Sequence, residues 1–209
     1  NVNNFSKTNL PKATELVSKL SNATQRNARH TMFSHYLTTH QDLPLWVLVT
    51  KLTFGEITNF YKLITPNIQE KILEDIHKEY MTEYRISIMN PTSTLIPIFS
   101  EILDVLVEYR NICAHGDRLY NHRIIGPKKT IKKLTYYFVP NPKGSESSVY
   151  GVLISLRLLL PRIAYKSVID EIISELLLLK ESLPIIQFNQ VLAKMELTLQ
   201  WKQTLETLK

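Results

Sequence analysis

Apolar side chains recur at intervals of three and four along most of the chain, which is the spacing of one face of an α-helix. Residues 12–40, for example, place Ala13, Leu16, Val17 and Leu20 at this spacing. The same pattern predicts further helices from about Leu45, over 57–64, from Pro66 to about Tyr84, over 95–115, and over about 150–181 and 184–206. We therefore predict an all-α fold, a helical bundle.

Proline, glycine and capping residues mark where these helices begin and end. Thr65-Pro66 is typical of a helix start, with the threonine as N-cap and the proline in the first helical position. Gly116 indicates the C-terminus of the long apolar helix, which we expect to end near His115. Pro161 predicts a kink in the helix that contains it.

Residues 117–150 are the least helical part of the sequence and predict a basic, partly extended loop insertion after the long helix. Within them, residues 134–139 have strand propensity and predict either a short strand or an extended loop. Residues 1–11 predict a mobile lead-in, and residues 1–209 as a whole predict a single helical domain. Because the first residue is Asn1, the sequence is compatible with a fragment or a processed product whose upstream segment is missing.

The composition is that of a soluble globular protein, with 44% apolar and 21% charged residues. No stretch approaches the ~20 consecutive apolar residues of a membrane span, so we expect no membrane partner. The one cysteine, Cys113, excludes an internal disulfide and a zinc site built from cysteines, and it fits a reducing cytoplasm. We expect Cys113 to be buried on the long apolar helix.

The net charge of +6 is concentrated in one stretch. Residues 118–133 contain six basic side chains and no acidic one, while the other 19 Lys and Arg residues balance the 19 Asp and Glu residues. Such a strip is typical either of a phosphate-rich partner or of a solvated loop. Its basic residues are Arg118, Arg123, Lys128, Lys129, Lys132 and Lys133.

An arginine and a histidine lie five residues apart at the end of the long apolar helix, in Arg110-Asn111-Ile112-Cys113-Ala114-His115-Gly116. On an ideal helix this offset is about 140° around the axis, so the two side chains do not share a face. They converge if the helix unwinds at His115, which Gly116 permits.

This pair suits RNA cleavage without a metal or another cofactor, and we expect neither. A histidine can take or give a proton near neutral pH. A guanidinium can hold phosphate oxygens through two parallel hydrogen bonds. The spacing alone is weak evidence, because a chain with eight Arg and six His contains about 0.7 such pairs by chance. In the alternative interpretation, Arg110 caps helix carbonyls and His115 packs at a bend.

The residues around the pair add to this evidence. Arg110-Asn111-Ile112-Cys113-Ala114-His115, followed by Arg118-Leu119-Tyr120-Asn121, resembles the signature of the Abi family, the AbiD- and AbiF-like abortive-infection proteins. His35-Tyr36, Leu43-Pro44-Leu45-Trp46-Val47-Leu48-Val49 and Leu52-Thr53-Phe54-Gly55-Glu56-Ile57 resemble the other characteristic blocks of that family, in the expected order. The resemblance covers about residues 30–125.

The resemblance implies membership of the HEPN superfamily and a HEPN-type helical bundle. It implies that Arg110 and His115 are the catalytic pair and that Asn111 is their polar helper. It also implies a homodimer in which two motifs meet in one composite cleft. It further implies a role as a phage-defence toxin, restrained in some members by a cognate RNA or a protein antitoxin.

Two features depart from the family pattern. Gly116 stands where many members carry a second histidine, which argues against a two-histidine mechanism within one chain but leaves the partner's His115 available. The helical segment that commonly precedes the Trp46 block is also barely visible here.

Other histidines and aromatic residues have weaker signals. His30, His35 and His40 recur every five residues, whereas metal-binding pairs on helices prefer three or four, so we expect no metal site there. Arg29 and His35 repeat the arginine–histidine spacing, but on an unbroken helix they would face apart, which favours a structural or surface role.

Trp46 and Phe54 have aliphatic neighbours, and we predict that both pack in the core. Tyr120, Tyr136 and Tyr137 flank the basic residues and suit either base stacking or packing, and His122 suits either an RNA contact or a surface position.

We therefore expect a metal-independent endoribonuclease that acts on single-stranded RNA as a homodimer, with Arg110, Asn111 and His115 as catalytic residues. The expected RNA contacts are Arg118, Tyr120, Asn121, His122, Arg123, Lys128, Lys129, Lys132 and Lys133. The alternative is a non-catalytic RNA-binding or protein-interaction module of the same fold. A DNA-binding regulator is disfavoured, because no helix-turn-helix with an exposed recognition helix is evident.

Overall fold

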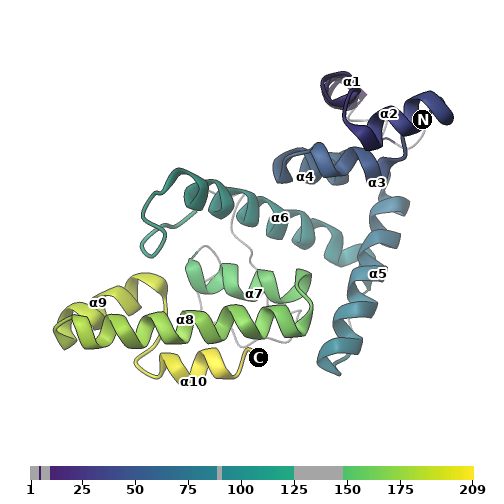
Figure 1. Cartoon of the computed structure of the whole chain (residues 1–209). Helices are drawn as coiled ribbons and strands as arrows, with labels where there is room; N and C mark the ends of the chain where they lie inside the picture. The colour runs from purple at the N-terminus through teal and green to yellow at the C-terminus, as the bar shows by residue number, and fades with distance from the viewer. Residues whose placement is uncertain (1–4, 6–9, 89–90, 125–147) are drawn as a thin grey trace. The chain divides into compact units, whose positions relative to one another are not determined.

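The computed structural model describes residues 5, 10–88, 91–124 and 148–209, and this part of the chain confirms the all-α prediction (Figure 1). These residues form ten α-helices, one short 3-10 helix and no strand. The helices are α1 (Leu10–Asn27), α2 (Thr31–Thr39), α3 (Leu45–Leu48), η3 (Val49–Lys51), α4 (Phe54–Leu63), α5 (Pro66–Tyr84), α6 (Thr92–His115), α7 (Val149–Leu159), α8 (Arg162–Ser182), α9 (Ile185–Met195) and α10 (Trp201–Glu206). The segment 134–139, predicted as a strand or extended loop, lies outside the described residues.

The chain divides into two compact units, an N-terminal unit of residues 1–70 and a C-terminal unit of residues 71–209. The boundary lies within α5. The organisation of residues 1–209 as one domain stays a prediction. None of the helices in the described ranges is long and apolar enough to cross a membrane.

The N-terminal unit is built on a small apolar cluster. Ala23 of α1, Phe33 of α2, and Val47 and Leu48 of α3 are buried together, and the half-buried Leu20, Tyr36, Leu43 and Leu52 pack against them.

The α4 helix then starts with a capping box, in which the hydroxyl of Thr53 accepts from the Glu56 amide and the Glu56 carboxylate accepts from the Thr53 amide.

The predicted helix over residues 12–40 is two helices, because the chain breaks between Asn27 and Thr31. The Asn27 side-chain amide donates to the carbonyl of Ala23 at 2.8 Å, and the His30 amide donates to the Asn27 carbonyl at 2.8 Å. These bonds satisfy backbone groups that a continuous helix would use, so the chain can turn. The turn lets Phe33 bury beside Ala23 in the same cluster.

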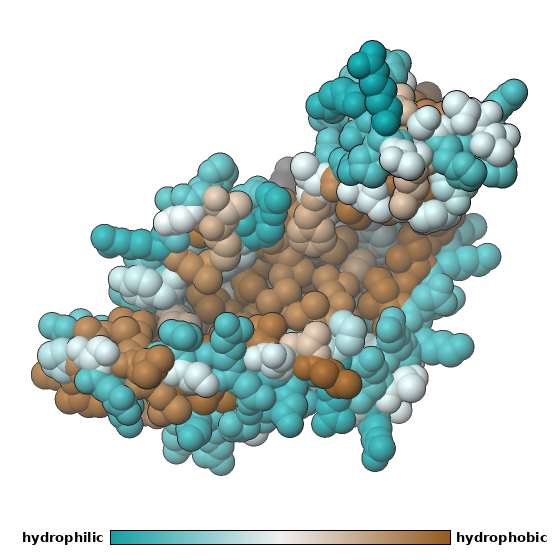
Figure 2. All heavy atoms as spheres, in the orientation of Figure 1, coloured by the Kyte–Doolittle hydropathy of each residue, from teal (hydrophilic) through white to brown (hydrophobic). Residues whose placement is uncertain are grey.

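In the C-terminal unit, α6 buries one side along most of its length. Its stripe of buried residues includes Leu95, Ile98, Ile102, Val105, Tyr109 and Ile112, at the helical spacing that the sequence predicts. The neighbouring α7 contributes Leu153, Ile154 and Leu158. Figure 2 shows apolar residues gathered where α6 and α7 lie side by side. The stripe leaves the opposite side of α6 for polar residues.

Pro161 ends a helix instead of kinking one, which corrects the sequence prediction. The α7 helix stops at Leu159, Leu160 is extended, and α8 begins at Arg162. A proline disfavours helical backbone in the residue before it, so the chain leaves the helix at Leu160. Glu83 of α5 accepts a hydrogen bond from the Arg162 amide and so satisfies one of the free amides of the new helix.

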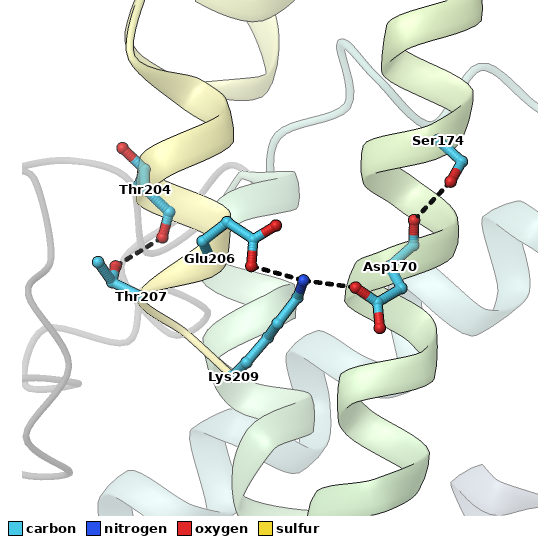
Figure 3. A network of polar contacts seen from close by, with 6 residues as sticks. All are labelled: Asp170, Ser174, Thr204, Glu206, Thr207 and Lys209. Carbon is cyan, nitrogen blue, oxygen red and sulfur yellow. Dashed lines mark hydrogen bonds and ion pairs between the residues drawn. The ribbon is translucent and has the colours of Figure 1, made fainter.

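The last helical segment, expected over residues 184–206, is likewise divided into α9 and α10. Glu196 follows α9 with φ of 59°, a left-handed conformation that ends the helix. The Lys209 ammonium then contacts the carboxylates of Asp170 on α8 and Glu206 on α10, as Figure 3 shows. Hydrogen bonding to both acids raises the pKa of Lys209 and connects the end of the chain to α8.

Candidate active site at the end of helix α6

The three predicted catalytic residues lie on the last two turns of α6, and all three are exposed. One guanidinium nitrogen of Arg110, Nη1, donates to the side-chain oxygen of Asn111 at 3.2 Å. Asn111 precedes His115 by four residues, so these two lie one helical turn apart on the same face. Asn111 thus stands between the arginine and the histidine.

The helix ends just beyond this site. Gly116 has φ of 70° and its amide donates to the carbonyl of Cys113 at 3.3 Å, while the Asp117 amide donates to the carbonyl of Ile112 at 3.1 Å. This pair of bonds is the Schellman arrangement, which needs a left-handed residue and so favours glycine. The predicted end of the helix near His115 is therefore confirmed.

The geometry does not support convergence by unwinding at His115. His115 stays helical, and the backbone turns only at Gly116. Arg110 and His115 therefore keep the angular separation of about 140° that five helical residues impose. Within one chain, Arg110 is hydrogen-bonded to Asn111, which lies one helical turn before His115.

The opposite side of this helix end is anchored in the core. Tyr109 is 3% exposed and Ile112 is 9% exposed. The Tyr109 hydroxyl donates to the carbonyl of His122 at 2.8 Å, and burial raises the pKa of Tyr109. This anchoring holds the exposed face of the last two turns in a defined orientation.

Cys113 is exposed, so the prediction that it is buried is wrong. At this end of α6 only the stripe through Tyr109 and Ile112 is covered, and Cys113 and Ala114 lie beside the stripe in solvent. Helical periodicity identifies the apolar stripe of α6. It does not show how many residues on either side of the stripe the neighbouring elements bury.

The residues that follow α6 divide into two groups. Arg118, Tyr120 and Asn121 are exposed. His122, by contrast, lies with its ring 5.2 Å from the ring of Tyr109 and its Nε2 3.3 Å from the Glu108 carboxylate. Within the described residues, no carboxylate forms an ion pair with Arg110 or Arg118.

Arg123 forms an ion pair with Glu196 at 2.6 Å. This contact joins the segment after α6 to the end of α9. The sequence around Arg123 does not predict the ion pair, because Glu196 is distant in the chain. The guanidinium still exposes part of its surface, since the Arg123 side chain is 47% accessible. Lys128, Lys129, Lys132, Lys133, Tyr136 and Tyr137 lie outside the described residues, and their RNA contacts stay predictions.

The remaining candidates belong to the N-terminal unit. Arg29 lies in the turn between α1 and α2, so the unbroken helix on which Arg29 and His35 were compared does not exist. Trp46 is 57% exposed, so its predicted burial in the core is wrong, whereas Phe54 is half-buried. In the described part of the chain, no group of three or more His, Cys, Asp or Glu residues could hold a metal ion.

Comparison with known proteins assigns the chain to a family. The model of the Abi-like protein family matches residues 1–121, more than half of the chain. The chain belongs to the Abi-like family. No curated protein and no solved structure matches it.

The family match ends shortly after the candidate site. In this Abi-like protein it includes α1 to α6 with Arg110, Asn111 and His115, and it ends at Asn121. The helices α7 to α10, together with residues 125–147, lie beyond the matched part. The partners that α7 to α10 provide, such as Glu196, are therefore features of this chain rather than of the matched family region.

Proposed function

We propose that this Abi-like protein is a metal-independent endoribonuclease of the HEPN type, which cleaves single-stranded RNA as the toxin of an abortive-infection system against phage. The observation that carries the proposal is the arrangement at the end of α6. An exposed arginine is hydrogen-bonded to Asn111, one helical turn before an exposed histidine. The family match supports the abortive-infection role.

The proposed reaction uses the RNA's own hydroxyl group as nucleophile. The 2′-oxygen attacks the adjacent phosphorus and forms a new P–O bond, while the bond from phosphorus to the 5′-oxygen breaks. A base takes the proton of the 2′-hydroxyl, and an acid gives a proton to the departing 5′-oxygen. The products are a 2′,3′-cyclic phosphate and a 5′-hydroxyl, and no metal enters the balance.

Each of the three residues suits one part of this reaction. Arg110 binds two oxygens of the scissile phosphate and stabilises the charge that grows on them. His115 carries a proton, because imidazole exchanges protons near neutral pH. Asn111, already bonded to Arg110, holds the guanidinium beside the face that carries His115.

One chain supplies one histidine at this site, whereas the reaction needs both a base and an acid. A homodimer that brings two α6 ends together would supply a second His115, so one histidine could accept the proton while the other donates. The exposed last turns of α6 leave this face accessible to a second copy. We therefore include the homodimer in the proposal.

The test is cleavage of a labelled single-stranded RNA in EDTA by the native chain, by His115→Ala and by a control, Cys113→Ala. Cys113 is an exposed neighbour on the same turn, so its loss should leave cleavage intact. We expect the native chain and the control to produce 2′,3′-cyclic phosphate ends and His115→Ala to lose at least about 100-fold in rate.

Equal cutting by all three proteins would contradict the assignment of His115. Tight, salt-sensitive RNA binding by all three proteins without cutting would favour the non-catalytic RNA-binding module of the same fold. The Cys113→Ala control separates loss of chemistry from disturbance of the helix end.

A further inference from the structure

Four aromatic rings lie against one another on the N-terminal unit, on and beside α2 and α3. Figure 1 shows these two helices. The ring of Tyr36 lies 5.4 Å from that of His35, 5.5 Å from that of His40 and 5.6 Å from that of Trp46, measured between centroids. The two histidine rings are 5.8 Å apart. We call His35, Tyr36, His40 and Trp46 the α2–α3 aromatic patch.

The patch is exposed, although its support is buried. Trp46 is 57% exposed, while Val47 and Leu48, the next two residues, are buried in the cluster of the N-terminal unit. Tyr36 packs against the same cluster and touches Trp46 with its ring perpendicular to the indole. The cluster thus fixes the position of Trp46 but leaves most of its surface in solvent. The exposed indole, with the ring of Tyr36 against it and two histidine rings against that of Tyr36, offers a surface on which a planar group can stack.

The charges around the patch favour an anionic partner. Residues 26–41 contain two arginines and three histidines and no acidic residue. Arg29 is exposed in the turn that leads into α2, and no carboxylate pairs with it within the described residues. The next acid along the sequence, Asp42, accepts from the backbone amide of Leu43 at 2.8 Å.

We propose that the α2–α3 aromatic patch is a second RNA-contact surface, on which bases of a single strand stack. Single-stranded nucleic acid combines planar bases with regularly spaced anions. The patch offers exposed rings, and the sequence that leads into it carries Arg26 and Arg29 and no acidic residue. An acidic peptide would match the charge but not the rings. Trp46 is the principal stacking residue, and Arg29 contacts a phosphate. The choice of RNA rests on the proposed function, but the patch belongs to the N-terminal unit, whereas Arg110 and His115 belong to the C-terminal unit.

The fluorescence of Trp46 gives a direct test. The other tryptophan, Trp201, is 5% exposed and packs beside Phe188, so Trp201→Phe keeps an aromatic ring in the core and leaves Trp46 as the only indole. The ligand is a short 2′-O-methyl oligouridylate, which the full chain cannot cleave because its 2′-oxygen is blocked. We expect saturable quenching of Trp46, because a base stacked on the indole deactivates its excited state.

The affinity is measured in parallel from the fluorescence anisotropy of the labelled oligonucleotide. Trp46→Ala should raise the Kd about five-fold or more, the effect of losing one stacked base. The matched control is Leu45→Ala, because Leu45 is the adjacent residue and is 47% exposed. It should leave the Kd unchanged.

The dependence on salt separates stacking from charge. Trp46→Ala should weaken binding without changing the slope of log Kd against log salt concentration, whereas Arg29→Gln should lower that slope by about one phosphate contact. Binding without quenching, no binding at all, or equal losses in Trp46→Ala and Leu45→Ala would each overturn the proposal. Because the oligonucleotide cannot be cut, these results are independent of the cleavage test on His115.

Discussion

Gly116 occupies a conformation that most residues adopt only at a cost. Its φ of 70° lies in the left-handed region, and a Cβ added there would meet no atom within 4 Å. Any penalty of substitution therefore comes from the backbone and not from a clash. This residue lets α6 end directly after His115.

Gly116→Ala should lower the free energy of unfolding by about 1 kcal/mol, because an L-residue is strained in this conformation. Gly116→Asn should lower it by less, since asparagine tolerates the left-handed region. Urea denaturation of both variants measures the difference. Equal losses would contradict the backbone explanation.

His77 is a buried histidine in the C-terminal unit. It is 4% exposed on α5, and burial lowers its pKa to about 4. The folded protein therefore keeps His77 neutral, whereas the unfolded chain takes up a proton below about pH 6.5. The stability that depends on the neutral form is complete above pH 6.5 and is lost as the pH falls from 6.5 towards 4.

We expect the native chain to lose stability across this window, by up to about 3 kcal/mol from His77. His77→Gln should flatten the part of the profile between about pH 6.5 and 5, where most carboxylates remain ionised. The measurement is urea denaturation at a series of pH values. A native profile that is flat in this range would refute the prediction.

At the scale of the element, helix ends depend on local hydrogen bonds. The capping box of α4 joins the Thr53 hydroxyl to the Glu56 amide at 3.2 Å and the Glu56 carboxylate to the Thr53 amide at 2.7 Å. The bond from the Thr53 amide is the main cause of the lowered pKa of Glu56. The box thus stabilises the charged form of Glu56 as well as the first turn.

Thr53→Ala should lower the free energy of unfolding by about 1 kcal/mol, because the Glu56 amide at the start of α4 loses its acceptor and the Glu56 carboxylate loses the hydroxyl donor. Thr38→Ala is a matched control, since the exposed Thr38 bonds only carbonyls of its own helix. Thermal or urea unfolding of both variants decides the matter. If Thr38→Ala lowers the free energy of unfolding as much as Thr53→Ala does, the effect comes from removing any threonine side chain and not from the cap.

At the scale of the whole molecule, the proposed homodimer predicts how mixed subunits behave. If both His115 side chains of a dimer take part in one reaction, a dimer with one His115→Ala chain is inactive. After subunits exchange at random in an equal mixture, about one quarter of the dimers are fully native, so activity should fall to about one quarter of that of the native protein at the same total concentration.

Cleavage rate against the fraction of native chain is the measurement. Independent sites would leave about one half of the activity, a linear dependence that would reject the composite site. Mixing with Cys113→Ala should leave the rate unchanged at every ratio. This control excludes effects of the exchange procedure.

The local pattern of the sequence was sufficient to predict much of this protein. The apolar spacing predicts the helices, Thr65-Pro66 predicts the start of α5, and Gly116 predicts the end of α6. These predictions hold because helical hydrogen bonds and caps join residues that are close in the sequence. The same locality places Arg110, Asn111 and His115 together on the last turns of one helix.

Only the tertiary structure decided which surfaces are covered and which partners meet. Cys113 and Trp46 are exposed although their neighbours in sequence are apolar, because burial depends on which elements pack against a helix. Arg123 forms an ion pair with Glu196 at the end of α9. Pro161 separates α7 from α8, and the Glu83 carboxylate on α5 accepts a hydrogen bond from the amide of Arg162 at the start of α8. Contacts between residues distant in the chain leave no periodic signal in the sequence, and they arise only when the helices pack.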